Sequence, residues 1–210
     1  MKKILAIIGA GHLGQQIAHY GITDNKYDNV VFFDDFSKEK CINGYTILGN
    51  TEKIESEFQK NSFDELIIGI GYKNLNVRKQ YYHQFEEKIP FGKIIHSSCW
   101  VDETAKINAG CVVYPNCCID ANVSIDANTI LNLACTVSHD TVVGKHCFLS
   151  PRVALAGFVS IEEQCIIGIN STVIDNLSIV AKTQLGGGTV LIKSIEKPGL
   201  YVGNPHKFIR

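Results

Sequence analysis

The chain has 210 residues, of which 45% are apolar and 20% charged, and its 20 basic and 21 acidic side chains give a net charge of −1. A chain of this length can bury a sizeable core in one compact domain or in two small ones. The balanced charge argues against a nucleic-acid coat or a polybasic membrane arm, and no apolar run of about 18 residues is present to span a bilayer.

The first apolar segment follows Met1-Lys2 and predicts a buried strand over residues 3–9. This segment is short for the core of a signal peptide, and no small-residue cleavage site follows it, so we expect no secretory leader. Gly9, Gly11 and Gly14 come next and open a predicted helix that extends to about residue 20.

Strands and helices alternate through the rest of this region. Apolar runs predict strands at 29–34 and 64–71, and helices are expected at 52–60 and 74–88. This alternation predicts a small parallel α/β sheet. We place the boundary at residue 92, so that residues 1–92 form one domain and residues 93–210 a second one.

The glycines at the first turn fit a nucleotide-binding fingerprint, in which a strand, a tight turn and a helix N-terminus let a pyrophosphate approach backbone N–H groups. Asp34 and Asp35 end the second predicted strand, where an acid can bind ribose hydroxyls. Because a dinucleotide site uses two such halves and only residues 1–92 are present, we expect one nucleoside diphosphate. The alternative is that the glycines only allow the strand and helix to pack closely.

A six-residue period dominates the second domain. From Ile95 to Leu191, all 17 positions spaced six apart are Ile, Val or Leu, and the fourth residue after each is usually small. This hexapeptide repeat is typical of a parallel β-helix, in which three hexads form one triangular coil and the coils stack about 4.8 Å apart. The aliphatic side chains then point inward, and the small residues fit at the corners.

The eight cysteines first suggest disulfides or a metal site. Six of them occupy the small position of the hexad, namely Cys99, Cys111, Cys117, Cys135, Cys147 and Cys165. They alternate there with Ala, Val, Ser and Thr, and no C-x-x-C pair occurs, so we interpret them as packing residues in a reducing cytoplasm. We expect no metal, and Cys41 and Cys118 stay unassigned.

His139-Asp140 is the candidate catalytic pair. His139 follows the inward-facing Val137 by two residues, so it need not point into the core. A neutral imidazole beside a carboxylate suits a general base that takes a proton from an attacking amine. Adjacent strand residues face opposite sides, so Asp140 can orient His139 only through the geometry of a corner. The alternative is a surface pair without a catalytic role.

The last coils are rich in glycine, with Gly168, then Gly186-Gly187-Gly188, then Gly203-Asn204-Pro205. Glycines in a β-helix wall leave room for a long ligand to lie against it, and the nearby lysines at 193, 197 and 207 could meet phosphates. The alternative is turn chemistry with a solvated basic tail.

Over its whole length the chain resembles the PglD/NeuD-type sugar acyltransferases, which join a short nucleotide-sugar-binding α/β domain to a left-handed β-helix. The matching motifs are Gly9-Ala10-Gly11-His12, Asp34-Asp35, Gly71, Asn74 and Arg78, Leu131-Asn132, Ser138-His139-Asp140, Gly186-Gly187-Gly188 and Gly203-Asn204-Pro205. The resemblance implies α/β plus all-β architecture, a homotrimer with active sites between neighbouring β-helices, and a cytoplasmic enzyme of surface-glycan biosynthesis.

The resemblance also implies an activity and a set of site residues. Family members mostly acetylate the 4-amino group of a UDP- or dTDP-linked deoxy-sugar with acetyl-CoA. His139 would be the general base and Asp140 its support. The nucleotide sugar would be bound by Gly9, Gly11, His12, Asp34, Asp35, Gly71, Asn74 and Arg78. The coenzyme would be bound by Gly157, Gly187, Gly203, Asn204, Pro205 and Lys207.

Two positions depart from the family pattern. A second histidine often follows the base by nine residues, and here that position is Phe148. The C-terminal motif often reads Gly-x-Pro-Ala-Lys, whereas His206 precedes Lys207 in this chain. These departures affect the contacts expected for the acetyl group and for the adenine or phosphates of the coenzyme.

The implied mechanism is direct attack. His139 deprotonates the sugar ammonium, the amine attacks the thioester carbonyl, and a backbone N–H stabilises the oxyanion. No acyl-enzyme is needed, in keeping with the lack of a nucleophile motif. Two alternatives stay open: O-acetylation of a sialic acid or a related sugar, and a β-helix scaffold without catalysis.

Overall fold

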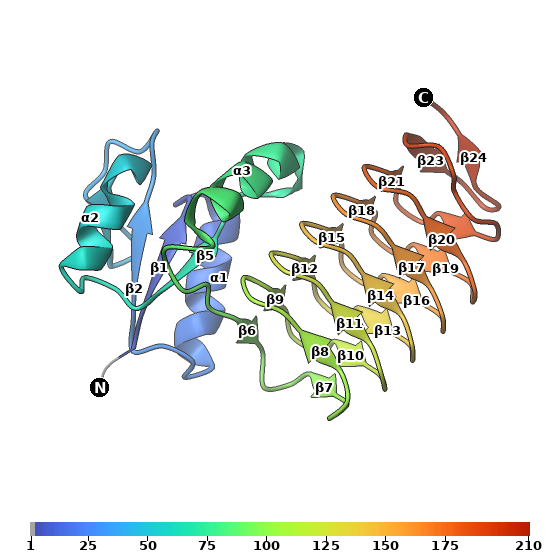
Figure 1. Ribbon diagram of the computed structural model, residues 1–210, viewed down its shortest axis with the longest axis horizontal. Coiled ribbons are helices and arrows are strands. Elements are labelled where there is room, and N and C mark those ends of the chain that lie inside the picture. The colour runs from blue at the N-terminus through green and yellow to red at the C-terminus, as the bar shows by residue number, and fades with distance from the viewer. Residues whose placement is uncertain (1–2) are drawn as a thin grey trace. The chain divides into compact units, whose positions relative to one another are not determined.

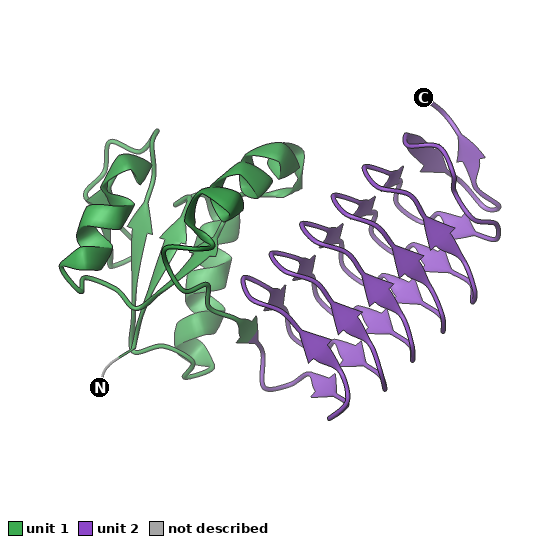
Figure 2. Cartoon of the chain, in the orientation of Figure 1, with its two compact units in different colours: residues 1–94 green, residues 95–210 purple. Residues whose placement is uncertain are grey.

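The computed structural model describes residues 3–210, so Met1 and Lys2, which precede the first predicted strand, lie outside the described residues. The chain divides into two compact units, Met1–Ile94 and Ile95–Arg210 (Figure 2). Across residues 3–210, no helix combines the length and the apolar character needed to cross a membrane.

The first unit is built on a five-stranded sheet with the strand order β3-β4-β2-β1-β5 (Figure 1). The strands are β1 (Ile4–Ile8), β2 (Asn29–Phe33), β3 (Cys41–Ile42), β4 (Tyr45–Gly49) and β5 (Glu65–Ile68). β1 lies between β2 and β5 and is parallel to both, and β4 is parallel to β2. The central strands are buried on both faces, so they appear in the sequence as continuous apolar runs. The predicted parallel α/β sheet is confirmed.

The sequence prediction missed the hairpin formed by β3 and β4. These strands are antiparallel and are joined by Asn43 and Gly44, which both have positive φ values, 48° and 83°. Two successive residues with positive φ make the tight hairpin turn that Asn-Gly strongly favours. The Asn-Gly pair was therefore a usable signal for a fourth and a fifth strand.

The predicted helices are present with shifted ends. They are α1 (His12–Thr23), η1 (Thr51–Lys53) continuing into α2 (Ile54–Gln59), and η2 (Tyr72–Asn74) continuing into α3 (Leu75–Phe85). α1 begins at His12 and extends three residues past the predicted end, burying Ile17 and Ala18. The predicted third helix ends at Phe85, ahead of Pro90.

The second unit is a left-handed parallel β-helix, and the predicted fold class is confirmed. Each of the 17 predicted aliphatic positions is the second residue of a two-residue strand, from β6 to β22. The strands are β6 (Ile94–Ile95), β7 (Trp100–Val101), β8 (Lys106–Ile107), β9 (Val112–Val113), β10 (Cys118–Ile119), β11 (Ser124–Ile125), β12 (Ile130–Leu131), β13 (Thr136–Val137), β14 (Val142–Val143), β15 (Phe148–Leu149), β16 (Ala154–Leu155), β17 (Ser160–Ile161), β18 (Ile166–Ile167), β19 (Thr172–Val173), β20 (Ser178–Ile179), β21 (Gln184–Leu185) and β22 (Val190–Leu191). The chain ends with β23 (Leu200–Val202) and β24 (Lys207–Phe208), which pair antiparallel.

The register shows that one coil contains 18 residues, because Ile119 pairs with Val137 and Val137 pairs with Leu155. The strands stack into three sheets of six, five and eight strands (Figure 1). From Ile119 to Leu191, every aliphatic side chain of the repeat is at most 2% exposed. These stacked side chains form the core of the unit through burial of apolar surface.

Each corner turns through a residue in the left-handed region, three positions after the aliphatic one. From Asn116 to Lys182, every sixth residue has a φ between 55° and 63°. Asparagine is common at these positions because its short polar side chain tolerates this conformation. The corner thus needs a particular backbone conformation as well as the small side chain that the sequence predicts.

The small position of the repeat also carries a hydrogen bond. Cys111 Sγ donates to the carbonyl of Asp126 at 3.0 Å, and Thr141 Oγ1 donates to the carbonyl of Ala156 at 2.9 Å, in both cases 15 residues further on. Cys135 and Cys147 make the same contact. All eight cysteines are free thiols, and the packing role predicted for those of the repeat is confirmed by their place in the core.

Candidate functional site

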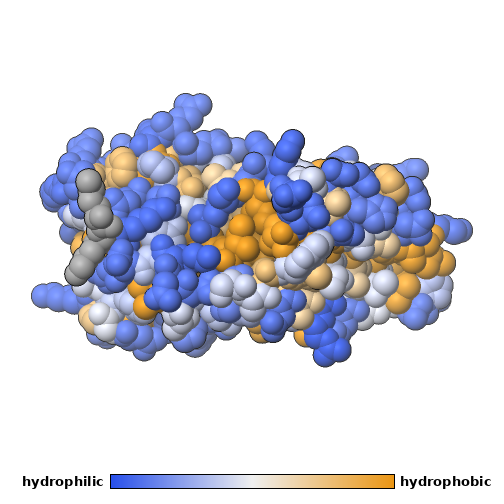
Figure 3. Space-filling view, turned by 90° about the horizontal axis from the view of Figure 1, so that it is seen from below, coloured by the Kyte–Doolittle hydropathy of each residue, from blue (hydrophilic) through white to orange (hydrophobic). Residues whose placement is uncertain are grey.

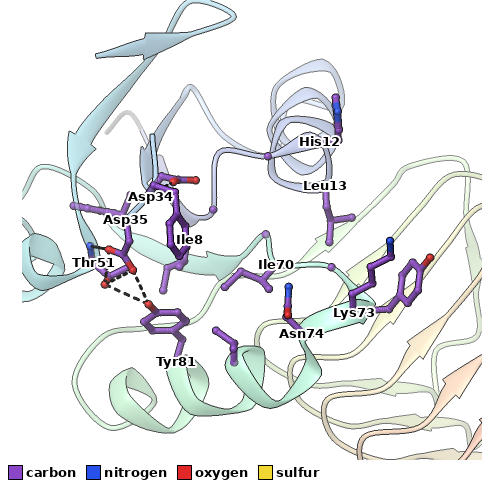
Figure 4. Close-up of a pocket in the computed structure, with 18 residues that line it drawn as sticks. Ile8, His12, Leu13, Asp34, Asp35, Thr51, Ile70, Lys73, Asn74 and Tyr81 are labelled. Atoms are coloured by element: carbon purple, nitrogen blue, oxygen red, sulfur yellow. Dashed lines mark hydrogen bonds between the residues drawn. The ribbon is translucent and has the colours of Figure 1, made fainter. Parts of the chain in front are cut away.

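A pocket of about 690 Å³ opens in the first unit at the carboxyl ends of β1, β2 and β5 (Figure 4). The carboxyl edge of a parallel sheet is where open α/β folds bind ligands, and this volume is typical of small-molecule sites. The pocket is lined by Ile8, Gly9, Gly11, His12, Leu13, Phe33, Asp34, Asp35, Phe36, Thr51, Gly69, Ile70, Gly71, Tyr72, Lys73, Asn74, Val77 and Tyr81. Seven of the eight residues predicted to bind the nucleotide sugar are among them.

The glycines of the first turn have different roles. A Cβ atom on Gly14 would lie 1.9 Å from the carbonyl oxygen of Gly9, so Gly14 is needed for α1 to pack against the end of β1. Around Gly11 and Gly71, in contrast, nothing lies within 4 Å of the Cβ position. The close-packing interpretation therefore fits Gly14, while Gly11 and Gly71 leave backbone exposed at the pocket.

Two helix starts border the pocket. Gly11 precedes α1 and Gly71 precedes η2, and neither residue makes a side-chain capping hydrogen bond. The first N–H groups of a helix have no partner within the helix and carry the positive end of its dipole. Lys73, on η2, adds a positive charge to the lining. Such an arrangement favours an anionic group such as a phosphate.

Asp34 shapes the pocket through its own hydrogen bonds. Its Oδ2 accepts the N–H of Ala10 at 2.7 Å, and its Oδ1 accepts the N–H groups of Phe36 and Ser37, both at 2.9 Å. The carboxylate thus ties the glycine turn after β1 to the loop after β2. This loop leaves the Phe36 side chain 93% exposed at the pocket.

Asp35 is held by two residues that sequence reasoning did not single out. Its Oδ1 accepts the Thr51 N–H at 2.7 Å, and its Oδ2 accepts the Tyr81 hydroxyl at 2.8 Å (Figure 4). Partial desolvation raises the pKa of Asp35, but the hydrogen bonds from Thr51 and Tyr81 outweigh it, so the pKa lies below its ordinary value. No motif links Asp35 to Thr51 or Tyr81, because sheet and helix packing alone brings them together.

Replacing Tyr81 with phenylalanine is expected to raise the pKa of Asp35 toward its ordinary value, because one of the hydrogen bonds that favour the ionised form is lost. In the folded protein the pKa is depressed, so Asp35 contributes stability above about pH 4 that is lost as the pH falls through the folded value. Carboxyl NMR titration measures the shift, with Tyr45→Phe as the control. An unchanged Asp35 titration in Tyr81→Phe would exclude this cause.

Arg78 was predicted to bind the nucleotide sugar, but it does not line the pocket. Its side chain is fully buried, and Nη1 donates to the carbonyls of Ile68 at 2.6 Å and Ile70 at 3.0 Å. The guanidinium binds the backbone at the end of β5 and therefore supports a wall of the pocket without lining it. The sequence pattern could place Arg78 near the site but could not show the direction of its side chain.

In the second unit, His139 and Asp140 lie at the corner between β13 and β14. Asp140 has a φ of 57°, and this left-handed conformation brings its carboxylate to the side of its neighbour, where His139 Nδ1 lies 2.9 Å from Asp140 Oδ2. The corner geometry expected from the sequence is confirmed. Because an ionised carboxylate only accepts, Nδ1 carries the proton and Nε2 keeps its lone pair. The His139 side chain is 49% exposed, so Nε2 is accessible to a substrate.

Gly157 lies one coil further on and faces the imidazole. A Cβ atom on Gly157 would lie 2.6 Å from Cε1 and 2.8 Å from Nε2 of His139. The ring of Phe158 meets the imidazole edge to face, with a centroid distance of 5.1 Å. The His139 ring thus lies among the Asp140 carboxylate, the backbone at Gly157 and the Phe158 ring.

Replacing Gly157 with alanine is expected to displace the His139 ring and to lower turnover about a hundredfold, the scale associated with misplacing a reacting group by about 1 Å. The melting temperature should change little, because a half-exposed side chain can move. As a control, the same substitution in a His139→Ala background meets no ring and should have no further effect. Full turnover in Gly157→Ala would contradict this positioning of His139.

The other residues predicted to bind the coenzyme lie elsewhere on the β-helix. Gly187 lies between β21 and β22, at a different corner from His139 and Gly157. Gly203, Asn204 and Pro205 join β23 to β24, and a cis peptide bond links Asn204 to Pro205. Lys207 is in β24. One chain therefore brings His139, Asp140 and Gly157 together, but it does not bring them to Gly187.

The two departures from the family pattern have structural consequences. Phe148 is 5% exposed, and its side chain places an apolar ring at the position where the pattern often has an imidazole. His206 packs against Tyr201, and its Nδ1 is buried without a hydrogen-bond partner among residues 3–210. Partial burial, followed by the charge of Lys193, lowers the pKa of His206. Within the same residues, no group of three or more His, Cys, Asp or Glu side chains could hold a metal ion.

Comparison with protein families finds a match within the first unit. Residues 4–85 match the model of the PglD N-terminal domain. We call these residues the PglD domain. The residues that line the pocket all lie within the PglD domain.

Solved structures match the complete chain. The acetyltransferase domain of PglB from Neisseria gonorrhoeae FA1090 has a TM-score of 0.92 and 26% identity, with 99% of this chain and 100% of that chain covered. The same domain in complex with acetyl coenzyme A gives a TM-score of 0.91. PerB from Caulobacter crescentus, solved with CoA and GDP-perosamine, gives a TM-score of 0.88 at 24% identity over 98% of this chain and 97% of that chain, which shows the shared fold.

Curated relatives match a shorter segment. A probable UDP-3-O-acylglucosamine N-acyltransferase 2 from Arabidopsis thaliana is 34% identical over 67 residues, or 32% of this chain and 22% of the relative. The UDP-3-O-acylglucosamine N-acyltransferase of Bordetella avium is 36% identical over 66 residues, or 31% of this chain and 18% of the relative. The chain thus spans about a fifth of the length of these relatives. With the PglD domain and the PglB likeness, the predicted family resemblance is confirmed.

Proposed function

We propose that this chain is an acetyltransferase that moves the acetyl group of acetyl-CoA to an amino group of a nucleotide-linked sugar. The observation that carries the proposal is the pairing of His139 Nδ1 with Asp140, which leaves Nε2 as an accessible base. The donor is supported by the likeness to the PglB acetyltransferase domain, which has been solved in complex with acetyl coenzyme A.

The pocket of the PglD domain supports a nucleotide-linked sugar as the acceptor of the acetyl group. Its pocket combines two helix starts, exposed glycine backbone and Lys73, a set suited to a diphosphate. The exposed Phe36 ring offers a face on which a base can stack. The curated relatives are named for N-acylation of a UDP-linked amino sugar. We therefore assign a UDP- or dTDP-linked amino-deoxy-sugar, acetylated at its 4-amino group for surface-glycan biosynthesis in the cytoplasm.

The chemistry proceeds by direct attack. His139 Nε2 takes a proton from the sugar ammonium, and the freed amine attacks the thioester carbonyl carbon. The Gly157 N–H, beside the imidazole, is the backbone donor that we assign to the developing oxyanion. The C–S bond then breaks and the amide forms, while the attacking nitrogen gives its second proton to the CoA thiolate. The proton held by His139 then passes to solvent. Asp140 keeps the neutral imidazole in the required tautomer and still accepts the hydrogen bond from Nδ1 when Nε2 is protonated.

A complete site in this proposal needs a second copy of the chain. His139 and Gly187 lie on different edges of the triangular coil, so a coenzyme that contacts both must lie between two β-helices. The β-helix has exposed apolar side chains, including Leu133, Ile169 and Ile174, which support burial against another copy. Figure 3 shows apolar surface in orange on one face of the molecule. A head-to-tail contact between different edges closes into a ring, and we propose a trimer.

A thiol-release assay tests the proposed function. The purified chain is mixed with acetyl-CoA and, separately, with UDP-4-amino, dTDP-4-amino and non-nucleotide amino sugars, and with a sialic acid. We expect free CoA only with a nucleotide-linked amino sugar. Release with the sialic acid alone would replace the proposal by O-acetylation. No release, together with no binding of acetyl-CoA or any sugar, would leave a scaffold role.

A further inference from the structure

The carboxylate of Asp140 is held from two sides. Its Oδ2 contacts His139 Nδ1 at 2.9 Å, and its Oδ1 accepts a hydrogen bond from Asn122 Nδ2 at 3.1 Å. Asn122 is 18 residues before Asp140, so it occupies the same corner position one coil earlier. The sequence motifs and the family resemblance give no role to Asn122.

Asn122 is itself fixed by the coil before it. It has a φ of 58°, and its N–H donates to Thr104 Oγ1 at 2.8 Å. The Thr104 hydroxyl in turn donates to Asp102 Oδ1 at 2.6 Å. Hydrogen bonds therefore run along one corner of the β-helix through three successive coils, from Asp102 to the imidazole of His139.

These hydrogen bonds matter because a carboxylate that is held at only one oxygen can rotate about its terminal C–C bond. If the Asp140 carboxylate rotates, His139 Nδ1 loses its acceptor, and the imidazole loses both its orientation and its tautomer. A donor on the second oxygen opposes that rotation and keeps Oδ2 facing His139 Nδ1.

A second contact of the same kind supplies a comparison. Asn108 Nδ2 donates to Asp126 Oδ1 at 3.0 Å, again across 18 residues, at another corner where Asp126 has no histidine contact among those described. The asparagine–aspartate contact is thus an inter-coil interaction that the fold uses more than once. At Asp140 it is joined to the candidate base.

We propose that Asn122 is a positioning residue for the transfer reaction, acting through Asp140 to hold the imidazole of His139. This inference rests on the proposed function, in which His139 is the general base. Asn122 makes no contact with substrate in this account, so its loss should affect the chemical step and leave the binding of both substrates intact.

The test is steady-state kinetics of Asn122→Gly, because glycine keeps the positive φ that alanine would strain. We expect kcat to fall about tenfold, the scale of one hydrogen bond to a charged group, with both KM values unchanged. Asn122→Asp, which places an acceptor against the Asp140 carboxylate, should lower kcat further. An unchanged kcat in both variants would overturn the proposal.

Two matched controls separate positioning from stability. Asn108→Ala removes an asparagine–aspartate contact of the same chemistry at another corner. Asn116→Gly changes a residue with a φ of 63° whose N–H donates to Ser98 Oγ, as that of Asn122 does to Thr104. Both should leave kcat unchanged even where the melting temperature falls. Equal losses of kcat in these controls and in Asn122→Gly would assign Asn122 a purely structural role.

A double-mutant cycle with Asp140→Ala completes the test. If Asn122 acts through Asp140, Asn122→Gly should lower kcat in the parent chain and have no further effect in Asp140→Ala. A full additional tenfold loss would overturn the proposal. If His139→Ala keeps its turnover, the proposed function fails. If His139→Ala is inactive while Asn122→Gly is fully active, only the role of Asn122 fails.

Discussion

Replacing His139 with alanine is expected to lower kcat by at least about a hundredfold, the lower end of the usual contribution of a general base. The imidazole, which faces Gly157, has a carboxylate partner on Nδ1, and its half-exposed ring leaves Nε2 for a substrate. Its removal should leave the fold intact, because the side chain is half exposed and is not part of the apolar core.

Turnover of acetyl-CoA with the best acceptor of the panel measures this effect, and the melting temperature shows whether the fold is kept. His96→Ala is the matched control, since His96 is a partly exposed histidine of the β-helix whose Nδ1 is hydrogen-bonded to Ser98 Oγ. The control should keep its turnover. Near-normal turnover in His139→Ala would rule out the assigned role of His139.

The second large effect is expected from Gly14→Ala, in the PglD domain. The added Cβ would lie 1.9 Å from Gly9 O and 3.3 Å from Phe32 Cε1, so α1 would have to move away from the sheet. Such overpacking costs about 1–3 kcal/mol and sometimes more, and here backbone opposes the new atom. We expect the free energy of unfolding of this unit to fall by about 3 kcal/mol or more, with loss of nucleotide-sugar binding.

Gly21→Ala tests the same change on the same helix at a position with room. The nearest atom to its Cβ position is Ile94 Cδ1 at 3.4 Å, an ordinary contact. Because alanine favours a helix over glycine by about 1 kcal/mol, this variant should be as stable as the parent chain or slightly more stable. Equal denaturant midpoints for Gly14→Ala and Gly21→Ala would contradict the close packing of α1 on β1.

The β-helix was predictable because its signal is a strict period. Each aliphatic position from Ile95 to Leu191 ends a strand, and the cysteines at the small position follow the same period. The left-handed conformation at each corner is less visible, because asparagine marks several corners but Ala134, Arg152 and Phe158 adopt it as well. There the stacking of the coils imposes the conformation against the local preference of the residue.

The site was predictable only in part, for a related reason. The motifs identified the residues that expose backbone or carry a charge, such as Gly11, Gly71 and His139. They could not identify Thr51 and Tyr81 around Asp35, or Asn122 behind Asp140, because these contacts depend on which residues the fold brings together. Likewise, Arg78 follows the expected pattern but faces the backbone of β5.

The most direct test of the account is the structure of the product. The chain is incubated with acetyl-CoA and the best UDP- or dTDP-linked 4-amino sugar, and the product is analysed by mass spectrometry and NMR. We expect one added acetyl group, bound as an amide to the nitrogen at C4, with release of one CoA for each product. An acetyl ester on a sugar hydroxyl, or an unmodified sugar in the presence of bound nucleotide sugar and acetyl-CoA, would contradict it.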